Sequence, residues 1–328
     1  MPELPEVTTT VRGLNKCVKN LVIMDIWSDW PKLIKSPSFE DFKKSIRNKK
    51  ILESERWGKN ILIKLSDDKT LLIHMKMTGH LMYGKWREAR NGDQHGWNWI
   101  PLGTREGGAR LDANFPDVSE QTSLAPRSLV RNHPLHDPYN RFIHLIFFLS
   151  NGRQLTLSDV RKFAKVLLID NDKIAEHSGL KSIGPEPLNK NFTPKKLAER
   201  LSKKSNWPVK QALMSQELVA GIGNIYSDEI LWRAGIHPLQ KVSETNQEKI
   251  RKIHAAMKTI LKKSISFGGD STSDYRNIHG ERGGFQHAHM VYRKTGKKCL
   301  RKNCRGKTER IKVAGRSAHF CNHHQQLR

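Results

Sequence analysis

The sequence has none of the long apolar segments that mark membrane or secreted proteins. Its 328 residues contain no apolar run as long as the roughly 18 residues a membrane helix needs, and no basic stretch followed by an apolar one opens the chain. Only four cysteines are present, which is too few for a disulfide scaffold. We therefore expect a cytoplasmic protein with reduced thiols, of about two domains by length.

Acidic residues are also scarce. Lys and Arg number 58 against 32 Asp and Glu, which gives a net charge of +26. Such an excess predicts a polyanionic partner, because each phosphate that a base neutralises releases counterions. A membrane surface is the alternative polyanion, but no basic amphipathic anchor helix is present. We therefore expect a nucleic acid as partner, and no membrane.

The charge is unevenly distributed along the chain. Residues 287–328 hold twelve Lys or Arg and one acid, 12 − 1 = +11, together with three of the four cysteines, which argues against a simple solvated tail. Residues 84–139 hold seven bases and seven acids and no clear periodicity. They are interpreted as an irregular insertion. Its Trp86, Trp97 and Trp99 could stack on bases, but we favour anchoring to the domain surface.

The two halves of the chain differ in predicted secondary structure. Short apolar runs separated by turn signals fill the first half, at 21–27, 50–56, 60–65, 70–75, 141–149, 153–158 and 165–169. These runs predict antiparallel strands of a sandwich or barrel, with one helix near 8–18. Segments of helical length follow, at 193–202, 209–215, 224–234 and 243–264. Residues 182–187 lie between the two regions and are interpreted as a hinge.

The chain start carries a possible nucleophile. Removal of Met1 would free the secondary amine of Pro2, and an N-terminal amine has a pKa of about 8, so a useful fraction is unprotonated at neutral pH. Such an amine attacks an aldehyde carbon to give an iminium. Glu3 is next to it and could act as general acid and base. The alternative is that Pro2 is only a leader residue.

The last thirty residues contain a candidate metal site. Cys299-x4-Cys304 is followed, after sixteen residues, by Cys321-x2-His324. Thiolates with imidazole suit tetrahedral zinc, so we expect one structural Zn²⁺. His323 and His319 are alternative fourth ligands, and loss of the metal is the alternative interpretation. Cys17 stands apart and is predicted to be a buried helix thiol.

Seven short motifs resemble one enzyme family in the order in which that family has them. They are MPELPEV (1–7), WGKN (57–60), IHMKMTG (73–79), DVRKF (159–163), GPEPL (184–188), QELVAGIGNIY (216–226) with RAGIHP (233–238), and GG (268–269) with GFQ (284–286) before the zinc-like segment. The chain therefore resembles the formamidopyrimidine-DNA glycosylases of the Fpg/Nei family, over nearly its whole length except about 84–139.

The resemblance implies an α+β multidomain fold. It has an N-terminal antiparallel β-sandwich with flanking helices at 1–178, which contains the insertion 84–139 and the catalytic residues. A helix-two-turn-helix domain follows at 179–288, and a zinc-finger β-hairpin at 289–328. The implied partner is damaged double-stranded DNA, bound by a monomer in the bacterial cytosol and nucleoid.

The resemblance also implies a mechanism. The Pro2 amine attacks C1′ of a damaged nucleoside, expels the oxidised base and forms a Schiff base, and β,δ-elimination then nicks the strand. Glu3 is the implied acid and base near the sugar, with Glu6 supporting it. Lys59 is the catalytic lysine that grips a phosphate near the lesion.

Further residues match the positions at which the family contacts DNA. Base extrusion leaves a hole that must be filled, and Met77, Arg161 and Phe163 match the filling residues. The other DNA-binding matches are His74, Asn224 and Arg316. Asn224 precedes a helix after Gly-Ile-Gly, so a phosphate contact and an N-cap are both open to it.

Three departures from the family pattern affect specificity. The loop expected to hold the everted base reads Gly-Gly-Asp-Ser-Thr-Ser at 268–273 instead of a Gly-Gly-Thr-Thr-like stretch, Lys76 stands where a glycine is usual, and the zinc ligands are not four cysteines. The leading hypothesis is a glycosylase/lyase for oxidised purines. The alternatives are a Nei-type enzyme for oxidised pyrimidines and a non-catalytic zinc protein that binds nucleic acid.

Overall fold

The computed structural model describes residues 1–89, 98–102 and 133–327. Its strands form two five-stranded sheets and a separate hairpin. The first sheet contains, in order, β1 (Ile23–Trp27), β8 (Ile143–Leu149), β9 (Gln154–Ser158), β6 (His80–Glu88) and β7 (Trp99–Leu102). The second contains β2 (Ile34–Ser36), β10 (Lys165–Asp170), β5 (Lys69–His74), β4 (Asn60–Leu65) and β3 (Ile51–Trp57).

The two sheets share one apolar core, as a sandwich requires. Ile63 and Ile73 of one sheet and Leu145 and Leu157 of the other lie in the same buried cluster. The predicted β-sandwich is therefore confirmed. Among the described strands, all pairs are antiparallel except β10 with β2, which is parallel and lies at the edge of its sheet.

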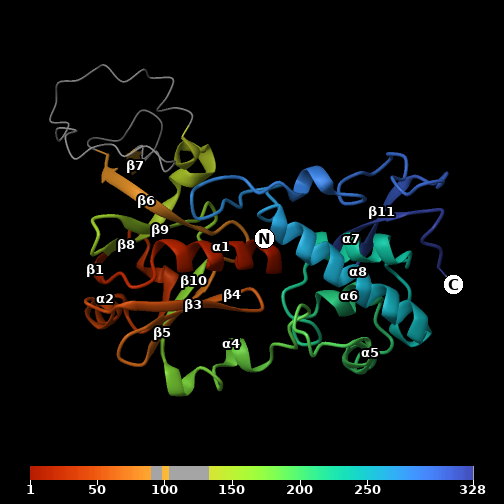
Figure 1. Cartoon of the computed structure of the whole chain (residues 1–328), viewed down its shortest axis with the longest axis horizontal. Helices are drawn as coiled ribbons and strands as arrows, with labels where there is room; N and C mark the ends of the chain where they lie inside the picture. Colours follow the sequence, from red (N-terminus) through yellow and green to blue (C-terminus); the bar gives the residue numbers. More distant parts are fainter. Residues whose placement is uncertain (90–97, 103–132, 328) are drawn as a thin grey trace.

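Helix α1 (Leu4–Cys17) begins earlier than the sequence pattern predicts. Glu3 is its N-cap, and the backbone N–H of Glu3 donates to the Glu6 carboxylate over 2.7 Å. Pro5 lies in the first turn, where the missing N–H of proline costs nothing. Pro5 is thus part of the helix start, whereas Pro2 precedes the N-cap. In Figure 1 the N-terminus lies between the sheets and the helical region.

Most of the remaining helices form a second layered unit beside the sandwich (Figure 1). Helices α2 (Phe39–Ile46) and α4 (Ser178–Lys181) pack on the sandwich, α4 through Leu180 against Leu62 and Leu72. The helices of the second unit are α5 (Pro194–Ser202), α6 (Val209–Met214), α7 (Asn224–Ala234) and α8 (Gln247–Ser266). They enclose their own apolar core, which includes Leu4 from α1. Helix α1 therefore contributes to both cores and joins the two units.

The segment 182–187, predicted as a hinge, is bonded to both units. Glu186 accepts hydrogen bonds from the Gly58 backbone (2.7 Å) and from the Arg56 guanidinium (2.6 and 2.8 Å) in the sandwich. On the other side, the Ala220 N–H donates to the Pro185 carbonyl over 3.0 Å. The connection is thus fixed to the turn that carries Lys59.

The described ends of the insertion are anchored by aromatic side chains. Trp86 and Trp99 are 3% and 6% exposed and pack in one cluster with Leu135. Surface anchoring, the interpretation favoured for the tryptophans, is confirmed for these two. Trp97 and most of the predicted insertion lie outside the described residues.

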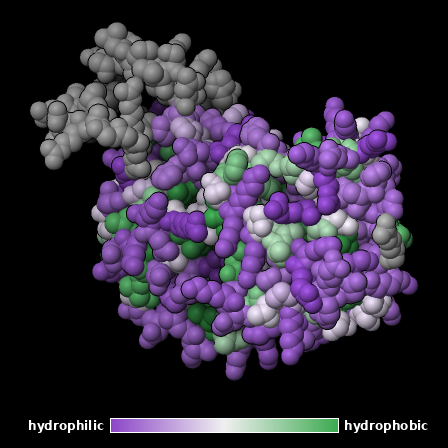
Figure 2. All heavy atoms as spheres, turned by 45° about the vertical axis from the view of Figure 1, so that its right-hand side comes forward, coloured by the Kyte–Doolittle hydropathy of each residue, from purple (hydrophilic) through white to green (hydrophobic). Residues whose placement is uncertain are grey.

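The C-terminal strands β11 (Thr308–Val313) and β12 (Arg316–Cys321) form the predicted hairpin. Ala314 and Gly315 both have positive φ, 47° and 78°, which matches a two-residue turn of type I′. The face in Figure 2 is mainly hydrophilic. In the part of the chain that is described, no helix is long and apolar enough to cross a bilayer.

Candidate active site

A cleft of about 830 Å³ brings together residues from the sandwich, the helical unit and the hairpin. Six of the predicted site residues line it: Glu3, Lys59, Met77, Arg161, Asn224 and Arg316. Met1 also lines it and is 43% exposed. Pro2, the next residue, is buried and is not among the residues that line the cleft. Removing Met1, which lines the cleft, would make the Pro2 nitrogen the amino terminus beside it.

The Glu3 carboxylate is held at the N-terminus of α7. It accepts hydrogen bonds from the backbone N–H groups of Gly223 (2.6 Å) and Ile225 (3.0 Å), where the helix dipole favours an anion. A Cβ on Gly223 would lie 2.5 Å from the Glu3 carboxyl carbon, so only glycine permits this approach. Burial raises the pKa of Glu3, and the Lys59 charge and the two backbone donors oppose the rise. Glu3 is thus suited to hold a proton at a higher pH than an ordinary carboxyl.

Lys59 is the cation of this cluster. It lies in the turn between β3 and β4 and is only 6% exposed. Burial lowers the pKa of Lys59, whereas the carboxylates of Glu3 and Glu6 raise it. Two acids therefore compensate a charge that points into the cleft.

Glu6 lies behind Glu3 and does not line the cleft. Its carboxylate accepts from the Tyr226 hydroxyl (2.5 Å) and from the Asp270 backbone N–H (2.7 Å). Burial raises the pKa of Glu6 to about 7, and the Tyr226 hydrogen bond opposes the rise. Tyr226 was part of a quoted motif but received no role from the sequence, because its partner is 220 residues away.

Met77, Arg161 and Phe163, which we call the wedge residues because they are predicted to fill the hole left by the base, contact one another; Met77 and Arg161 line the cleft. The Arg161 guanidinium donates to the Met77 sulfur over 3.2 Å and lies 4.5 Å from the centre of the Phe163 ring. Met77 and Phe163 are 38% and 48% exposed. Ordinary core packing, the alternative interpretation for both, is therefore wrong.

A buried carboxylate builds the wedge loop, and sequence reasoning gave it no role. Asp159 is 1% exposed. It accepts from the Thr78 hydroxyl and, over 2.7 Å, from the Ala164 backbone N–H. The Arg161 N–H in turn donates to the Thr78 hydroxyl over 3.1 Å. The loops that carry Met77 and Arg161 are thus fixed to each other through Asp159.

The remaining predicted DNA contacts lie around the cleft or beside it. Asn224 is the first residue of α7, but Gly223 occupies the N-cap position, so the N-cap interpretation of Asn224 is wrong. The Asn224 Oδ1 is buried and has no hydrogen-bond partner among the described residues. Arg316 is exposed at the hairpin tip. His74 is half-buried and is not among the residues that line the cleft. Its Nδ1 accepts from the Lys76 N–H over 2.9 Å.

Lys76 adopts a backbone conformation that favours glycine. Its φ is +54°, which costs a residue with a Cβ roughly 1 kcal/mol. Burial and the nearby charge of Lys76 lower the pKa of His74 to about 3, so this histidine is neutral. Lys76 therefore strains the backbone at a position where a glycine would not, and it adds one positive charge beside Met77.

The predicted metal ligands converge. One donor atom from each of Cys299, Cys304, Cys321 and His324 lies within 4.8 Å of the others. Three thiols and one imidazole at such spacing are the donor set that tetrahedral zinc prefers, so the residues form a site for one structural zinc ion. Among the described residues, the cluster takes His324 as its fourth member, and neither His319 nor His323 belongs to it.

Buried charges attach this hairpin to the helical unit. Lys210 and Asp228, both fully buried, form an ion pair of 2.6 Å, and Asp228 also accepts from the His319 backbone.

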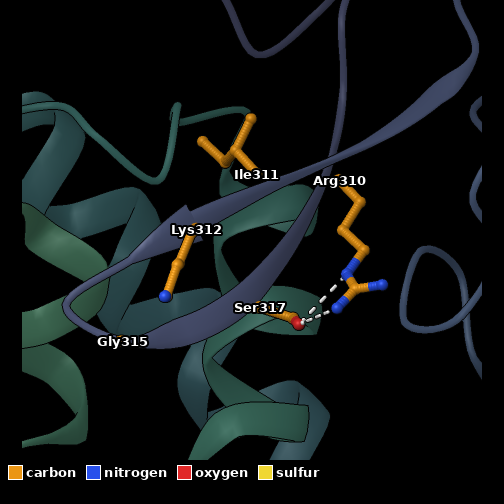
Figure 3. Close-up of a pocket in the computed structure, with 5 residues that line it drawn as sticks. All are labelled: Arg310, Ile311, Lys312, Gly315 and Ser317. Carbon is orange, nitrogen blue, oxygen red and sulfur yellow. Dashed lines mark hydrogen bonds between the residues drawn. The ribbon is translucent and has the colours of Figure 1, made fainter.

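Beside the hairpin turn, a hollow of about 500 Å³ is lined by Arg310, Lys312 and Ser317 (Figure 3). The Arg310 guanidinium donates to the Ser317 hydroxyl over 2.8 and 3.1 Å. The hairpin therefore presents fixed cations next to the cleft.

Three family models match the chain and cover most of it. The formamidopyrimidine-DNA glycosylase N-terminal domain matches residues 1–166, and the formamidopyrimidine-DNA glycosylase H2TH domain matches residues 183–276. The zinc finger found in FPG and IleRS matches residues 296–323.

Named relatives and solved structures match along the full chain. The formamidopyrimidine-DNA glycosylases of Bacillus subtilis and Pelotomaculum thermopropionicum are 34% and 33% identical, with 98% of each chain covered. A crystal structure of Lactococcus lactis Fpg with DNA containing an abasic site has a TM-score of 0.75 at 32% identity and 99% coverage of both chains. A structure of MutM with DNA containing carbocyclic 8-oxo-G has a TM-score of 0.75 at 34% identity, covering 99% of this chain and 100% of that one.

Proposed function

The chain belongs to the formamidopyrimidine-DNA glycosylase family, and we propose that it removes damaged bases from double-stranded DNA in base-excision repair. It acts as a bifunctional DNA glycosylase and AP lyase on oxidised purines, namely 8-oxoguanine and formamidopyrimidines. One observation carries the proposal: the amino terminus lies in a cationic cleft beside Glu3 and Lys59. The relatives with DNA complexes support the substrate class.

The first step uses the nitrogen of Pro2 after Met1 is removed. The amine attacks C1′ of the damaged nucleoside, and the glycosidic bond breaks as the new N–C1′ bond forms. The departing base takes a proton, and the pyrrolidine nitrogen loses one. Opening of the C1′–O4′ bond then gives the iminium. Glu3, whose burial keeps it protonated to a higher pH, donates the proton that O4′ requires.

The later steps break the strand. Loss of a proton from C2′ expels the 3′ phosphate, and loss of a second proton from C4′ expels the 5′ phosphate. Water then hydrolyses the Schiff base and restores the amine. Glu6 supports Glu3 from behind, and Lys59 grips a phosphate near the lesion. The hydrogen bond from the Glu3 backbone to the Glu6 carboxylate supports the first role, and the place of Lys59 in the cleft lining supports the second.

The wedge residues and the outer contacts hold the DNA. Met77 and Phe163 fill the space that the everted base leaves, and Arg161 hydrogen-bonds the orphaned base.

Asn224 and Arg316 contact phosphates from α7 and the hairpin. His74 contacts the backbone through the ring nitrogen that Lys76 does not use. Cys299, Cys304, Cys321 and His324 would hold the zinc ion, which would stabilise the hairpin that carries Arg316. We propose a monomer in the bacterial cytoplasm and nucleoid.

Covalent trapping tests this function. Borohydride reduction on a duplex with 8-oxoguanine should give a protein–DNA adduct, and Pro2→Gly should weaken it. Leu52→Ala, a change at a 42% exposed residue of β3, serves as control and should trap normally. The absence of any adduct from the wild-type chain on either lesion class would contradict the proposal.

The altered loop at 268–273 keeps the pyrimidine alternative testable. Asp270 replaces the first threonine of the usual stretch and bonds to Glu6 through its backbone. Nicking of 8-oxoguanine duplexes in preference to thymine glycol duplexes supports the purine assignment. The reverse preference would assign the chain to the Nei-type activity, with the same amine chemistry.

A further inference from the structure

The segment that returns from the insertion is bonded to the loop that borders the cleft. We call residues 268–275 the base loop, and Arg276 follows it directly. The Arg276 side chain is 1% exposed. Its Nη2 donates to Asp137 over 2.9 Å at Oδ1 and lies 2.8 Å from Oδ2. Asp137 is the N-cap of the short helix Pro138–Arg141 at the end of the insertion.

The other nitrogen of the same guanidinium shapes the base loop. Arg276 Nη1 donates to the carbonyl oxygens of Tyr275 (2.8 Å) and Ser273 (3.2 Å). The Ser271 hydroxyl donates to the same Tyr275 carbonyl over 2.6 Å. Ser273 and its two neighbours line the cleft. One guanidinium nitrogen of Arg276 therefore bonds two carbonyls of the base loop, while the other bonds Asp137.

A second contact holds the returning segment in place. Asn140 is fully buried, and its Nδ2 donates to the Gly280 carbonyl over 3.2 Å while its Oδ1 lies 2.9 Å from His80 Nε2. Gly280 has φ +80°, and a Cβ there would lie 2.8 Å from Asn140 Nδ2. The two segments thus pack closely at two points, and Asp137 cannot shift without disturbing both.

Electrostatics make the arrangement depend on Asp137. A buried guanidinium that loses its carboxylate is an uncompensated charge, which is strongly unfavourable in a low-dielectric interior. Without Asp137, Arg276 would have to move toward water and would release the Ser273 and Tyr275 carbonyls. The order of the base loop is therefore coupled to the end of the insertion.

We propose that Asp137 and Arg276 are a positioning pair for the base loop, so that the insertion helps determine how the enzyme holds an everted damaged base. This inference rests on the proposed function. Neither residue touches the reacting atoms. The pair acts by keeping the cleft-facing part of the loop in one conformation.

The two half-reactions of the enzyme separate this role from general folding. Base release needs the base loop, whereas cleavage of a preformed abasic site involves no everted base and uses the amine, Glu3 and Lys59. Asp137→Asn and Arg276→Leu should each slow release of 8-oxoguanine by about tenfold or more in single turnover, because small losses of positioning are costly. Cutting of an abasic-site duplex should stay within about twofold of wild type, since the amine and the sugar are unchanged.

A matched control comes from the same sandwich. Asp29 pairs with His144 over 2.9 Å, and the Asp29 side chain is 27% exposed against 21% for Asp137. Asp29→Asn should leave both rates unchanged. Asp137→Glu, which keeps the charge, should restore part of the lost base release. The double variant Asp137→Asn/Arg276→Leu buries no unpaired charge, so it tests the same loss if Asp137→Asn alone does not fold.

The outcomes are distinguishable. A loss confined to base release, rescued by Asp137→Glu, supports the pair as a positioning device. Equal losses in both half-reactions, or no loss in either, would overturn it while leaving the proposed function intact. A wild-type chain that neither releases a base nor cuts abasic sites would overturn the proposed function, and this inference with it.

Discussion

Tyr226 on α7 donates a hydrogen bond of 2.5 Å to Glu6 in the first turn of α1. The Tyr226 hydroxyl also lies 2.6 Å from the Ser264 hydroxyl of α8. Hydrogen bonds therefore connect Ser264 through Tyr226 to Glu6, which in turn accepts from the Glu3 backbone next to Pro2. The position of the amino terminus depends on this contact between the two units.

Glu6 should make stability depend on pH. Its folded pKa of about 7 is raised above its ordinary value, so its contribution is full below about pH 4.5 and is lost as pH rises through 7. The shift is worth about 3 kcal/mol at most. Urea unfolding of the wild type and of Glu6→Gln, which mimics the neutral acid, should give free energies whose difference changes across pH 4.5–7.5. Parallel curves would contradict the assignment.

Tyr226→Phe should shift the pH dependence of stability that Glu6 causes to higher pH. Burial is the main cause of the raised Glu6 pKa, and the phenol opposes it. Removing the phenol should therefore raise the pKa further and shift the loss of stability to higher pH. Unfolding curves at the same pH values measure the shift, and an unchanged midpoint pH would show that the hydroxyl does not act on Glu6.

Removal of zinc should affect DNA binding more than the sandwich. The four ligands lie at 299–324, and the cluster that contains the cysteines is separate from the sandwich core. Chelation or Cys299→Ser should weaken binding by at least about tenfold, because phosphate contacts of the hairpin are lost. Melting of the sandwich should change little. Cys17→Ser, on α1 outside the site, is the control and should bind normally.

The wedge should matter for activity and not for folding. Met77 and Phe163 are exposed, so Met77→Ala and Phe163→Ala should change the free energy of unfolding by no more than about 0.5 kcal/mol. Base release should fall by about tenfold or more, since nothing fills the gap in the duplex. Leu52→Ala is equally exposed and should alter neither quantity. A large loss of stability in either wedge variant would favour a core role.

DNA affinity should fall steeply with salt. A footprint of about six phosphates predicts a slope near −5 for log K against log salt. Arg316→Ala should reduce the steepness by about one. Binding titrations at several salt concentrations measure both slopes, and a flat response would exclude binding dominated by phosphates.

The sequence predicted the units of the fold well because their signals are local. Apolar alternation marked the strands, and the Cys and His spacing marked the metal site, including His324 as the fourth ligand. The predicted helix near 8–18 begins too late, because Glu3 caps the helix and α1 starts at Leu4.

The missed residues have distant partners. Tyr226 and Glu6 are 220 positions apart, Asp137 and Arg276 are 139 apart, and Thr78 and Asp159 are 81 apart. Periodicity and spacing within one segment carry no information on such pairs. They become visible only when the fold brings the two segments together.

The central claim is that the nitrogen of Pro2 carries the reaction, and mass spectrometry of the borohydride-trapped complex tests it most directly. The account predicts a protein that lacks Met1, with the DNA fragment attached to the peptide that begins with Pro2. Trapping should disappear when that nitrogen is acylated beforehand. An adduct on a lysine such as Lys59, or full activity of the acylated protein, would contradict the account.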